Sequence, residues 1–141
     1  PGADRAPADP QAAAERATKT TIHWQGTVDA SSVLRLLYCA ADVVAVPSRE
    51  DNMPLTAMEA QSCGRPVVGF EIGGLPDIIE HGSTGHLAPA QDSHDLAVGL
   101  SSLLDTQYAD RCGDRARRRA LDTWSPAAVV PQYRKLYDGA K

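Results

Sequence analysis

The sequence is poor in aromatic residues and has no excess of positive charge. Its 141 residues include one Phe, two Trp and four Tyr, and the formal net charge at pH 7 is -4. Binding to a nucleic acid requires a basic surface, and few aromatic side chains are present on which bases could stack. The composition therefore argues against a nucleic acid as partner.

Long apolar runs are also missing. No stretch approaches the roughly 20 apolar residues that a membrane-spanning helix needs, and residues 1–11 lack the apolar core of a signal peptide. We therefore expect a cytoplasmic protein without a transmembrane segment. A peripheral position of the longer parent protein at the inner face of the membrane stays open.

Cysteine and histidine are scarce and widely spaced. The three cysteines are odd in number and far apart in the sequence, which favours reduced thiols over a disulfide framework or a zinc site: Cys39, Cys63 and Cys112. The four histidines show no metal-ligand spacing: His23, His81, His86 and His94. The spacing of these residues therefore gives no indication of a metal site.

What the sequence does contain is enough for one folded domain. Hydrophobic residues make up 43% and charged residues 23% of the chain, a balance typical of a globular protein. Residues 1–10 are rich in Pro and Ala, and a short helical pattern follows at 11–16. We predict a linker or a partial first βα unit over 1–20 and a folded domain over 21–141, so that the fold is truncated at its N-terminal end.

Strand and helix signals alternate along this domain. Strands are predicted at 21–25, 42–46, 66–70 and 85–88, and helices at 30–40, 54–63, 76–82, 93–104, 108–121 and 126–137. This order predicts right-handed βαβ crossovers and a doubly wound, Rossmann-like parallel sheet with closing C-terminal helices. The apolar run 43–46 is expected to be covered on both faces of that sheet.

Two loops follow strands of the predicted sheet. Ligands of such sheets bind beyond the carboxyl ends of the strands, where Pro47–Met53 and Phe70–Gly74 should line one crevice. Gly73 and Gly74 serve either the close approach of a ligand or only a tight turn. Both interpretations remain open at this point.

The helix after the first loop carries the main functional signal. Pro54 can begin it and Gly64 can end it, and its free N–H groups near 53–56 favour an anion such as a diphosphate. Glu59 lies about five residues into the helix, roughly 7.5 Å along its axis, and can accept both hydroxyls of a ribose. Asp51 would face the group beyond the phosphates, with a sugar as the natural candidate. Taken singly, each acid is more often a solvated side chain.

In this combination the motifs resemble a known family over residues 22–137. It is the group of retaining, nucleotide-sugar-dependent glycosyltransferases with the two-domain GT-B fold, of the group 1, family 4 type. The motifs are Ala41-Asp42-Val43 leading into Pro47-Ser48, the acids Asp51 and Glu59 separated by seven residues, Cys63-Gly64-x-Pro66-Val67-Val68, Gly73-Gly74-x-Pro76-Asp77, and Gly82-x-x-Gly85 before Leu87.

The resemblance implies that 21–141 is the C-terminal, donor-binding domain. Glu59 matches the acid that binds the nucleotide ribose, and Asp51 takes the catalytic position beside the donor sugar, where the family usually carries a Glu. Met53, Pro54 and Leu55 fall where the family holds the diphosphate and sugar. Because Pro54 has no N–H group, Leu55 and Thr56 are the better donors. The remaining predicted donor-site residues are Ser48, Arg49, Asn52, Gly73 and Gly74.

The implied function is transfer of a hexose, with retention and without a metal or another cofactor, from a nucleotide-diphosphate sugar to a glycan or lipid-linked acceptor. The motif variant is similar to that of enzymes of bacterial polysaccharide biosynthesis. The family places an acceptor domain and a diphosphate-binding basic pair earlier in the chain, and neither is recognisable before Ile22, so we expect this chain alone to be inactive.

Other interpretations remain. The main alternative is a non-catalytic nucleotide-binding or interaction module of the same fold. An epimerase or a phosphorylase would need other residues, and a paired-carboxylate glycosidase is disfavoured because Glu59 should be buried along its helix.

Outside the central motif, we favour structural roles. Arginines at helical spacing are expected to form a solvated, salt-bridged face with interleaved acids, in preference to a patch for anionic lipid: Arg111, Arg115 and Arg119 with Asp110, Asp114 and Asp122. Three aromatic residues are expected in the core or in helix packing: Trp24, Trp124 and Tyr133.

Overall fold

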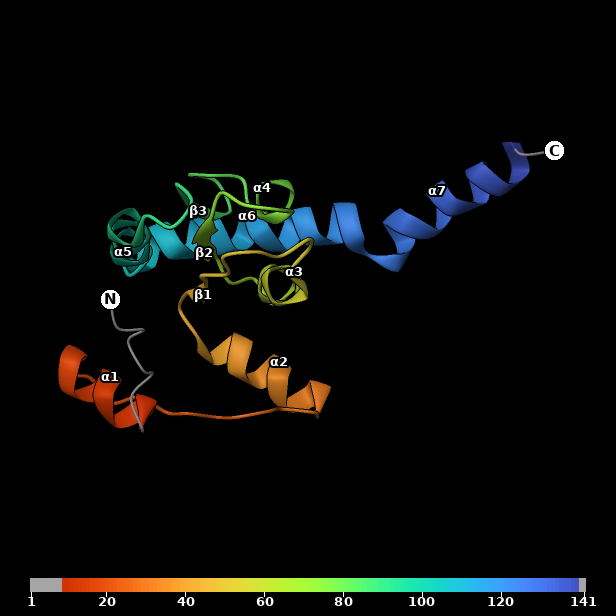
Figure 1. The fold of residues 1–141 in the computed structure, drawn as a ribbon. Coiled ribbons are helices and arrows are strands. Elements are labelled where there is room, and N and C mark those ends of the chain that lie inside the picture. The colour runs from red at the N-terminus through yellow and green to blue at the C-terminus, as the bar shows by residue number, and fades with distance from the viewer. Residues whose placement is uncertain (1–8, 140–141) are drawn as a thin grey trace, which may run out of the picture. The chain divides into compact units, whose positions relative to one another are not determined.

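The computed structural model describes residues 9–139 (Figure 1). The chain forms two compact units, with the boundary between Ser31 and Ser32. The predicted domain boundary between residues 20 and 21 stays a prediction, and positions 1–8 of the predicted linker lie outside the described residues. We describe the two units separately.

The first unit consists of a short helix and an extended segment. Helix α1 (Pro10–Thr18) begins at Asp9, whose side chain accepts a hydrogen bond from the backbone N–H of Ala12 (2.9 Å). The predicted strand 21–25 is wrong, because this segment has no strand partner among the described residues. Instead, the Ile22 N–H donates to Glu15 Oε1 (3.1 Å), and Gln11 Nε2 donates to the Ile22 carbonyl (2.8 Å). Side chains of α1 thus replace a neighbouring strand.

The second unit contains a parallel sheet with the order β1-β2-β3, as the alternating pattern predicts. The strands are β1 (Val44–Val46), β2 (Val67–Phe70) and β3 (Gly85–Ala88). Helix α2 (Ser31–Ala40) precedes β1, α3 (Leu55–Ser62) connects β1 to β2, and α4 (Leu75–Ile78) lies between β2 and β3. After β3 follow α5 (Ser93–Ser102), α6 (Thr106–Trp124) and α7 (Pro126–Gly139).

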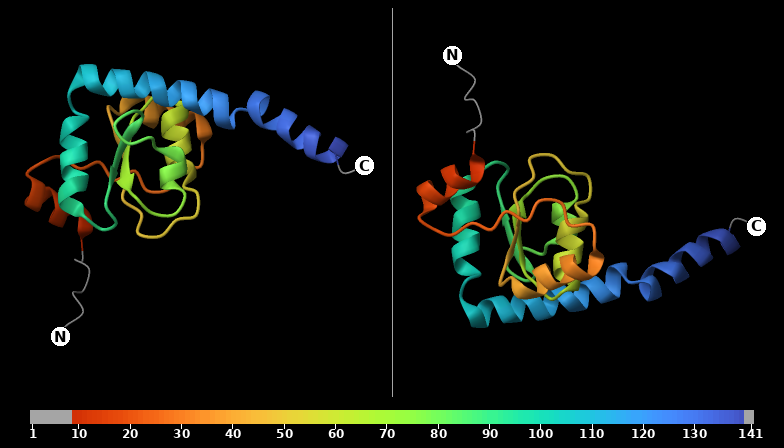
Figure 2. Two further views of the ribbon diagram at one scale, coloured as in Figure 1. Left: turned by 90° about the horizontal axis from the view of Figure 1, so that it is seen from above. Right: turned by 90° about the horizontal axis from the view of Figure 1, so that it is seen from below.

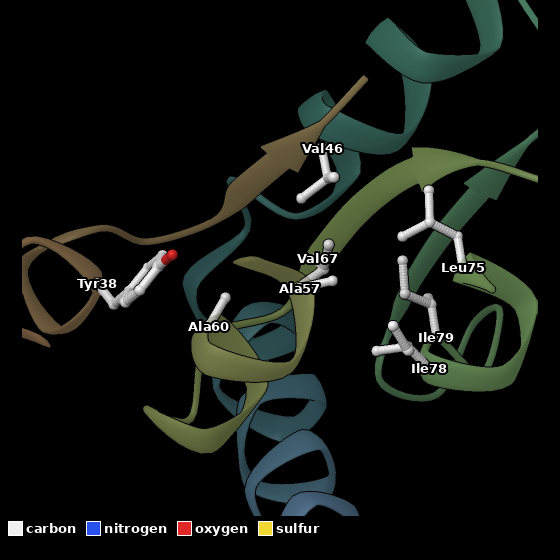
Figure 3. Close-up of a cluster of buried hydrophobic side chains, with 8 residues drawn as sticks. All are labelled: Tyr38, Val46, Ala57, Ala60, Val67, Leu75, Ile78 and Ile79. Carbon is white, nitrogen blue, oxygen red and sulfur yellow. The ribbon is translucent and has the colours of Figure 1, made fainter. Parts of the chain in front are cut away.

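Helices cover both faces of β2. Successive residues of a strand point to opposite sides of the sheet, so Val67 and Val68 pack against different helices. Val67 packs against α3, α4 and Tyr38 of α2, whereas Val68 packs against Leu103 and Cys112, which come from the end of α5 and from α6. Figure 3 draws the first cluster, with Tyr38 at one end of the row and Leu75 among the residues at the other. The Rossmann-like α/β class is therefore confirmed.

Two element predictions need correction. The run 43–46 is not covered on both faces: Ala45 is exposed, because β1 lies at the edge of the sheet and α5 and α6 pack on β2 and β3. The predicted helix 76–82 is only the short α4, because Ile79 adopts an extended conformation (φ -99°, ψ 119°). Buried Leu75 and Ile78 still fix this turn against the sheet.

The C-terminal helices follow the prediction in extent but not in all contacts. In Figure 2, α6 runs along one side of the three strands and α7 continues beyond it. No residue of α7 is fully buried, and Tyr133 is 58% exposed. Trp24 is 65% exposed, so its prediction as a packing residue is wrong, as is that of Tyr133. Trp124 is half-buried and packs against the first cluster.

The predicted salt-bridged face of α6 is also wrong. Among the described residues, no ion pair joins its arginines to the interleaved acids. Arg119 instead donates to the carbonyls of Asp77 (2.7 Å) and Ile78 (3.2 Å) and pairs with Glu80 (2.5 Å). It therefore binds the free carbonyl end of α4, which is a favourable place for a cation. In the described part of the chain, no helix combines the length and apolarity needed to cross a bilayer.

Candidate donor site

The two loops lie at the same carboxyl edge of the sheet, as predicted, and their backbones contact each other; the crevice that they were expected to line stays a prediction. A Cβ atom added to Gly73 would lie 1.7 Å from the carbonyl oxygen of Asp51, and one added to Gly74 would lie 2.2 Å from that of Asn52. Gly73 also has a positive φ of +49°. These glycines are therefore needed for the close approach of the backbone of the β1–α3 loop, in addition to any role toward a ligand.

Asp51 lies on the exposed part of that loop. Its Oδ1 accepts a hydrogen bond from the backbone N–H of Met53 at 3.1 Å, which forms a local Asx-type turn just before α3. Asp51 and Asn52 are both exposed. The turn holds the Asp51 carboxylate just before the helix, with one of its oxygens bound to the backbone.

Helix α3 begins without a side-chain cap. Pro54 is the N-cap residue (φ -68°, ψ 111°), and no side chain accepts from the first turn. The Ala57 N–H donates to the Pro54 carbonyl at 3.1 Å, whereas in the described part of the structure the N–H groups of Leu55 and Thr56 have no acceptor. These are the two donors that the sequence singled out. At the other end, Gly64 has a φ of +72° and ends the helix as predicted.

Glu59 differs from its expected environment. The prediction that it is buried along the helix is wrong, since it is exposed on α3. Its carboxylate is nevertheless oriented: the Tyr38 hydroxyl of α2 donates to Glu59 Oε2 at 3.0 Å. The exposed carboxylate is open to a ligand, and the hydrogen bond fixes it from the side of the core.

Tyr38 is the residue of this site that the sequence prediction missed. Its side chain is only 7% exposed and belongs to the first core cluster. Burial, followed by the hydrogen bond and the negative charge of Glu59, raises the pKa of Tyr38 to about 12. The hydroxyl therefore stays protonated at neutral pH and remains a donor. In the sequence it lies beside the apolar positions of the predicted helix 30–40, and no local pattern indicates that it reaches an acid 21 residues later.

The other predicted donor-site residues lie around the same loop. Ser48 is half-buried, and Arg49 is exposed. Met53 and Leu55 are 46% and 67% exposed, respectively, while Pro54 between them in the sequence is buried. The structure thus brings the predicted residues to one edge of the sheet, and their roles toward a donor stay predictions. Among the described residues, no group of three or more metal-ligating side chains occurs.

The sequence profile of group 1 glycosyl transferases matches residues 2–106, and the chain belongs to this family. It is 42% identical over 110 residues to D-inositol 3-phosphate glycosyltransferase of Corynebacterium glutamicum (strain R). That alignment covers 77% of this chain and 26% of the relative. The chain therefore spans about a quarter of the length of that relative.

Solved structures show the same fold. Sucrose-phosphate synthase from Thermosynechococcus elongatus has a TM-score of 0.77 at 30% identity, covering 92% of this chain and 33% of that protein. Anabaena HepE, solved in complex with UDP-glucose, has a TM-score of 0.67 at 27% identity, covering 73% of this chain and 29% of that protein. The predicted family and fold class are confirmed.

Proposed function

We propose that the chain forms the donor-binding part of a glycosyltransferase that transfers a hexose from a nucleotide-diphosphate sugar. One observation carries the proposal: an uncapped helix N-terminus lies between two carboxylates, with Asp51 on the loop before it and Glu59 exposed on the helix itself. Membership of the group 1 glycosyl transferases and the UDP-glucose complex of the similar HepE support this chemistry.

The diphosphate would bind at the start of α3. The N–H groups of Leu55 and Thr56 supply two donors, and the helix dipole adds partial positive charge at the same place. Such groups stabilise the negative charge that develops on the leaving diphosphate. We propose that binding needs no metal ion and no other cofactor. Arg49 and Ser48, which lie in the loop before α3, complete the phosphate side.

The ribose would bind to Glu59. The Tyr38 hydroxyl occupies one lone pair of Oε2, so that Oε1 remains for one ribose hydroxyl and the second lone pair of Oε2 for the other. A carboxylate that is already oriented loses less conformational entropy on binding. Tyr38 is therefore a positioning residue, which acts on the donor through Glu59.

The sugar would lie beside the exposed Asp51 carboxylate, in front of α3. The backbone N–H of Met53 donates to Oδ1 of Asp51, so that Oδ2 remains available to accept from a sugar hydroxyl. The neighbouring side chains of Met53 and Leu55 are apolar and exposed. We further propose that transfer proceeds with retention to a glycan or lipid-linked acceptor, which a separate acceptor domain binds. On this proposal, the chain alone binds the donor without transferring its sugar.

The test is calorimetric titration of the full-length parent protein with UDP-, GDP- and ADP-sugars, with and without EDTA. Replacement E59Q should weaken binding of the matching donor by about 10- to 100-fold, because a charged hydrogen-bond acceptor for two hydroxyls is lost. Replacement D51N should weaken binding of the nucleotide sugar but leave the affinity for the free nucleotide unchanged. EDTA should have no effect. D122N, on the exposed face of α6, is the matched control.

Unchanged donor affinity in both E59Q and D51N would disprove the site. Donor binding that depends on Glu59 in a parent protein without any transfer activity would instead identify a nucleotide-binding module. An E50Q variant tests whether the neighbouring acid, and not Asp51, contacts the sugar. Sugar transfer by the isolated 141-residue chain would contradict the need for a separate acceptor domain.

A further inference from the structure

Two of the three cysteines lie close together beside α3, although they are far apart in the sequence. Cys39 near the end of α2 and Cys63 just after α3 line one open cavity of about 290 Å³. Ser62 and the arginines Arg35 and Arg117 complete its lining. Cys112 lies apart from them, fully buried under the other face of the sheet.

The two thiols differ in accessibility. Cys39 is exposed and Cys63 is half-buried. Burial raises the pKa of Cys63, the neighbouring Cys39 thiol raises it further, and the positive charges of Arg35 and Arg117 oppose this rise. An exposed thiol next to a partly buried one is the arrangement in which the first reacts with an external reagent and the second resolves the product.

The same contact joins α2 to α3. Tyr38 and Cys39 are neighbours on α2, and they meet Glu59 and Cys63, which are four residues apart and therefore on one side of α3. Tyr38 is the only residue of α2 that is buried in the described structure. Helix α2 thus has few ties to the rest of the second unit, and a covalent bond here would fix it.

We propose that this cavity is a thiol-oxidation site, in which Cys39 and Cys63 react with a low-molecular-weight disulfide that carries carboxylates and close an internal disulfide. The two arginines favour the anionic reagent because its carboxylates approach them as the sulfur reaches Cys39. Neither the reaction nor its reagent depends on the donor site proposed above.

The reaction consists of two exchange steps. The Cys39 thiolate attacks one sulfur of the reagent; a bond forms between these sulfurs, the reagent's own S–S bond breaks, and its other half leaves as a thiolate that takes up the proton lost by Cys39. The Cys63 thiolate then attacks Cys39 Sγ and displaces the second half, which takes up the proton of Cys63. The two cysteines are oxidised, and one molecule of disulfide is reduced to two thiols.

The test uses the reduced chain and glutathione disulfide, followed by intact mass and peptide mapping without reductant. The unmodified chain should lose two hydrogens and give a peptide linked between Cys39 and Cys63. C63S should stop at a mixed disulfide on Cys39, and C39S should give neither product. C112S, the matched control, should behave like the unmodified chain. Oxidation should raise the thermal midpoint of the unmodified chain and not that of C39S.

Several results would overturn the proposal. A stable mixed disulfide on Cys39 in the unmodified chain would show that Cys63 cannot reach it, and disulfide-linked dimers in place of the internal link would do the same. Equal reaction rates at Cys112 and Cys39 would show that the cavity confers no selectivity.

The arginines have their own test. R35Q should slow the reaction with glutathione disulfide by about threefold and leave the reaction with neutral hydroxyethyl disulfide unchanged. R134Q, on the exposed helix α7, should alter neither rate. Equal slowing of both reagents by R35Q would refute the preference for an anionic disulfide.

Discussion

Replacement of Tyr38 by Phe provides the sharpest test of how the site is held together. The variant keeps the buried ring and removes only the hydroxyl that donates to Glu59 at 3.0 Å. A hydrogen bond to a charged acceptor contributes about 1.5–3 kcal/mol when both groups are buried. Glu59 is exposed and can bind water after the loss, so we expect Y38F to lower the free energy of unfolding by about 1 kcal/mol at pH 7.

At alkaline pH, the difference in the free energy of unfolding between Y38F and the unmodified chain should change sign. The folded-state pKa of Tyr38 is about 12, whereas an unfolded tyrosine titrates near 10. The stability that depends on protonated Tyr38 is therefore complete below about pH 10 and falls as the pH rises toward 12. By pH 11 the unmodified chain should have lost about 1.4 kcal/mol that Y38F does not lose. The two stability curves should cross between about pH 10.5 and 11.

The assay is urea unfolding in reducing buffer, followed by circular dichroism between pH 7 and 11. Y133F is the matched control, because the Tyr133 side chain is exposed, and it should follow the unmodified chain throughout. Equal stability of Y38F and the unmodified chain at pH 7 would show that the hydrogen bond contributes nothing. Parallel curves for the two proteins between pH 9 and 11 would refute the raised pKa of Tyr38.

Three further substitutions test the surroundings of the site by the same unfolding assay. G74A should cost about 1–3 kcal/mol, because the added Cβ would lie 2.2 Å from a carbonyl oxygen of the β1–α3 loop; G139A, with open space around its added Cβ, should cost much less. R119M should cost about 1–3 kcal/mol through loss of its bonds to the end of α4, while R118M should be nearly neutral. L75A, at a side chain with no exposed surface, should cost about 2–5 kcal/mol. An unchanged free energy of unfolding in G74A, R119M or L75A would contradict the contact that the substitution tests.

Local signals predicted most elements of the second unit because each depends on neighbouring residues. The apolar run of β2 and the Gly64 C-terminus of α3 are examples. The strand predicted at 21–25 failed because a strand also needs a partner, and Ile22 bonds instead to side chains of α1. Similarly, the spacing of Arg119 on its helix gave no indication that it binds the end of α4.

For the candidate site, the amino-acid pattern was enough to predict a loop after a strand, a helix that begins at a proline, and two acids eight positions apart, because all of these lie within one short segment. The surroundings of the two acids depend on how the chain folds. The fold placed Gly73 against the backbone of Asp51, and Tyr38 against Glu59. It also brought Cys39 and Cys63 to one cavity. These contacts join residues from different βα units, and no local pattern records them because they arise only when the helices pack on the sheet.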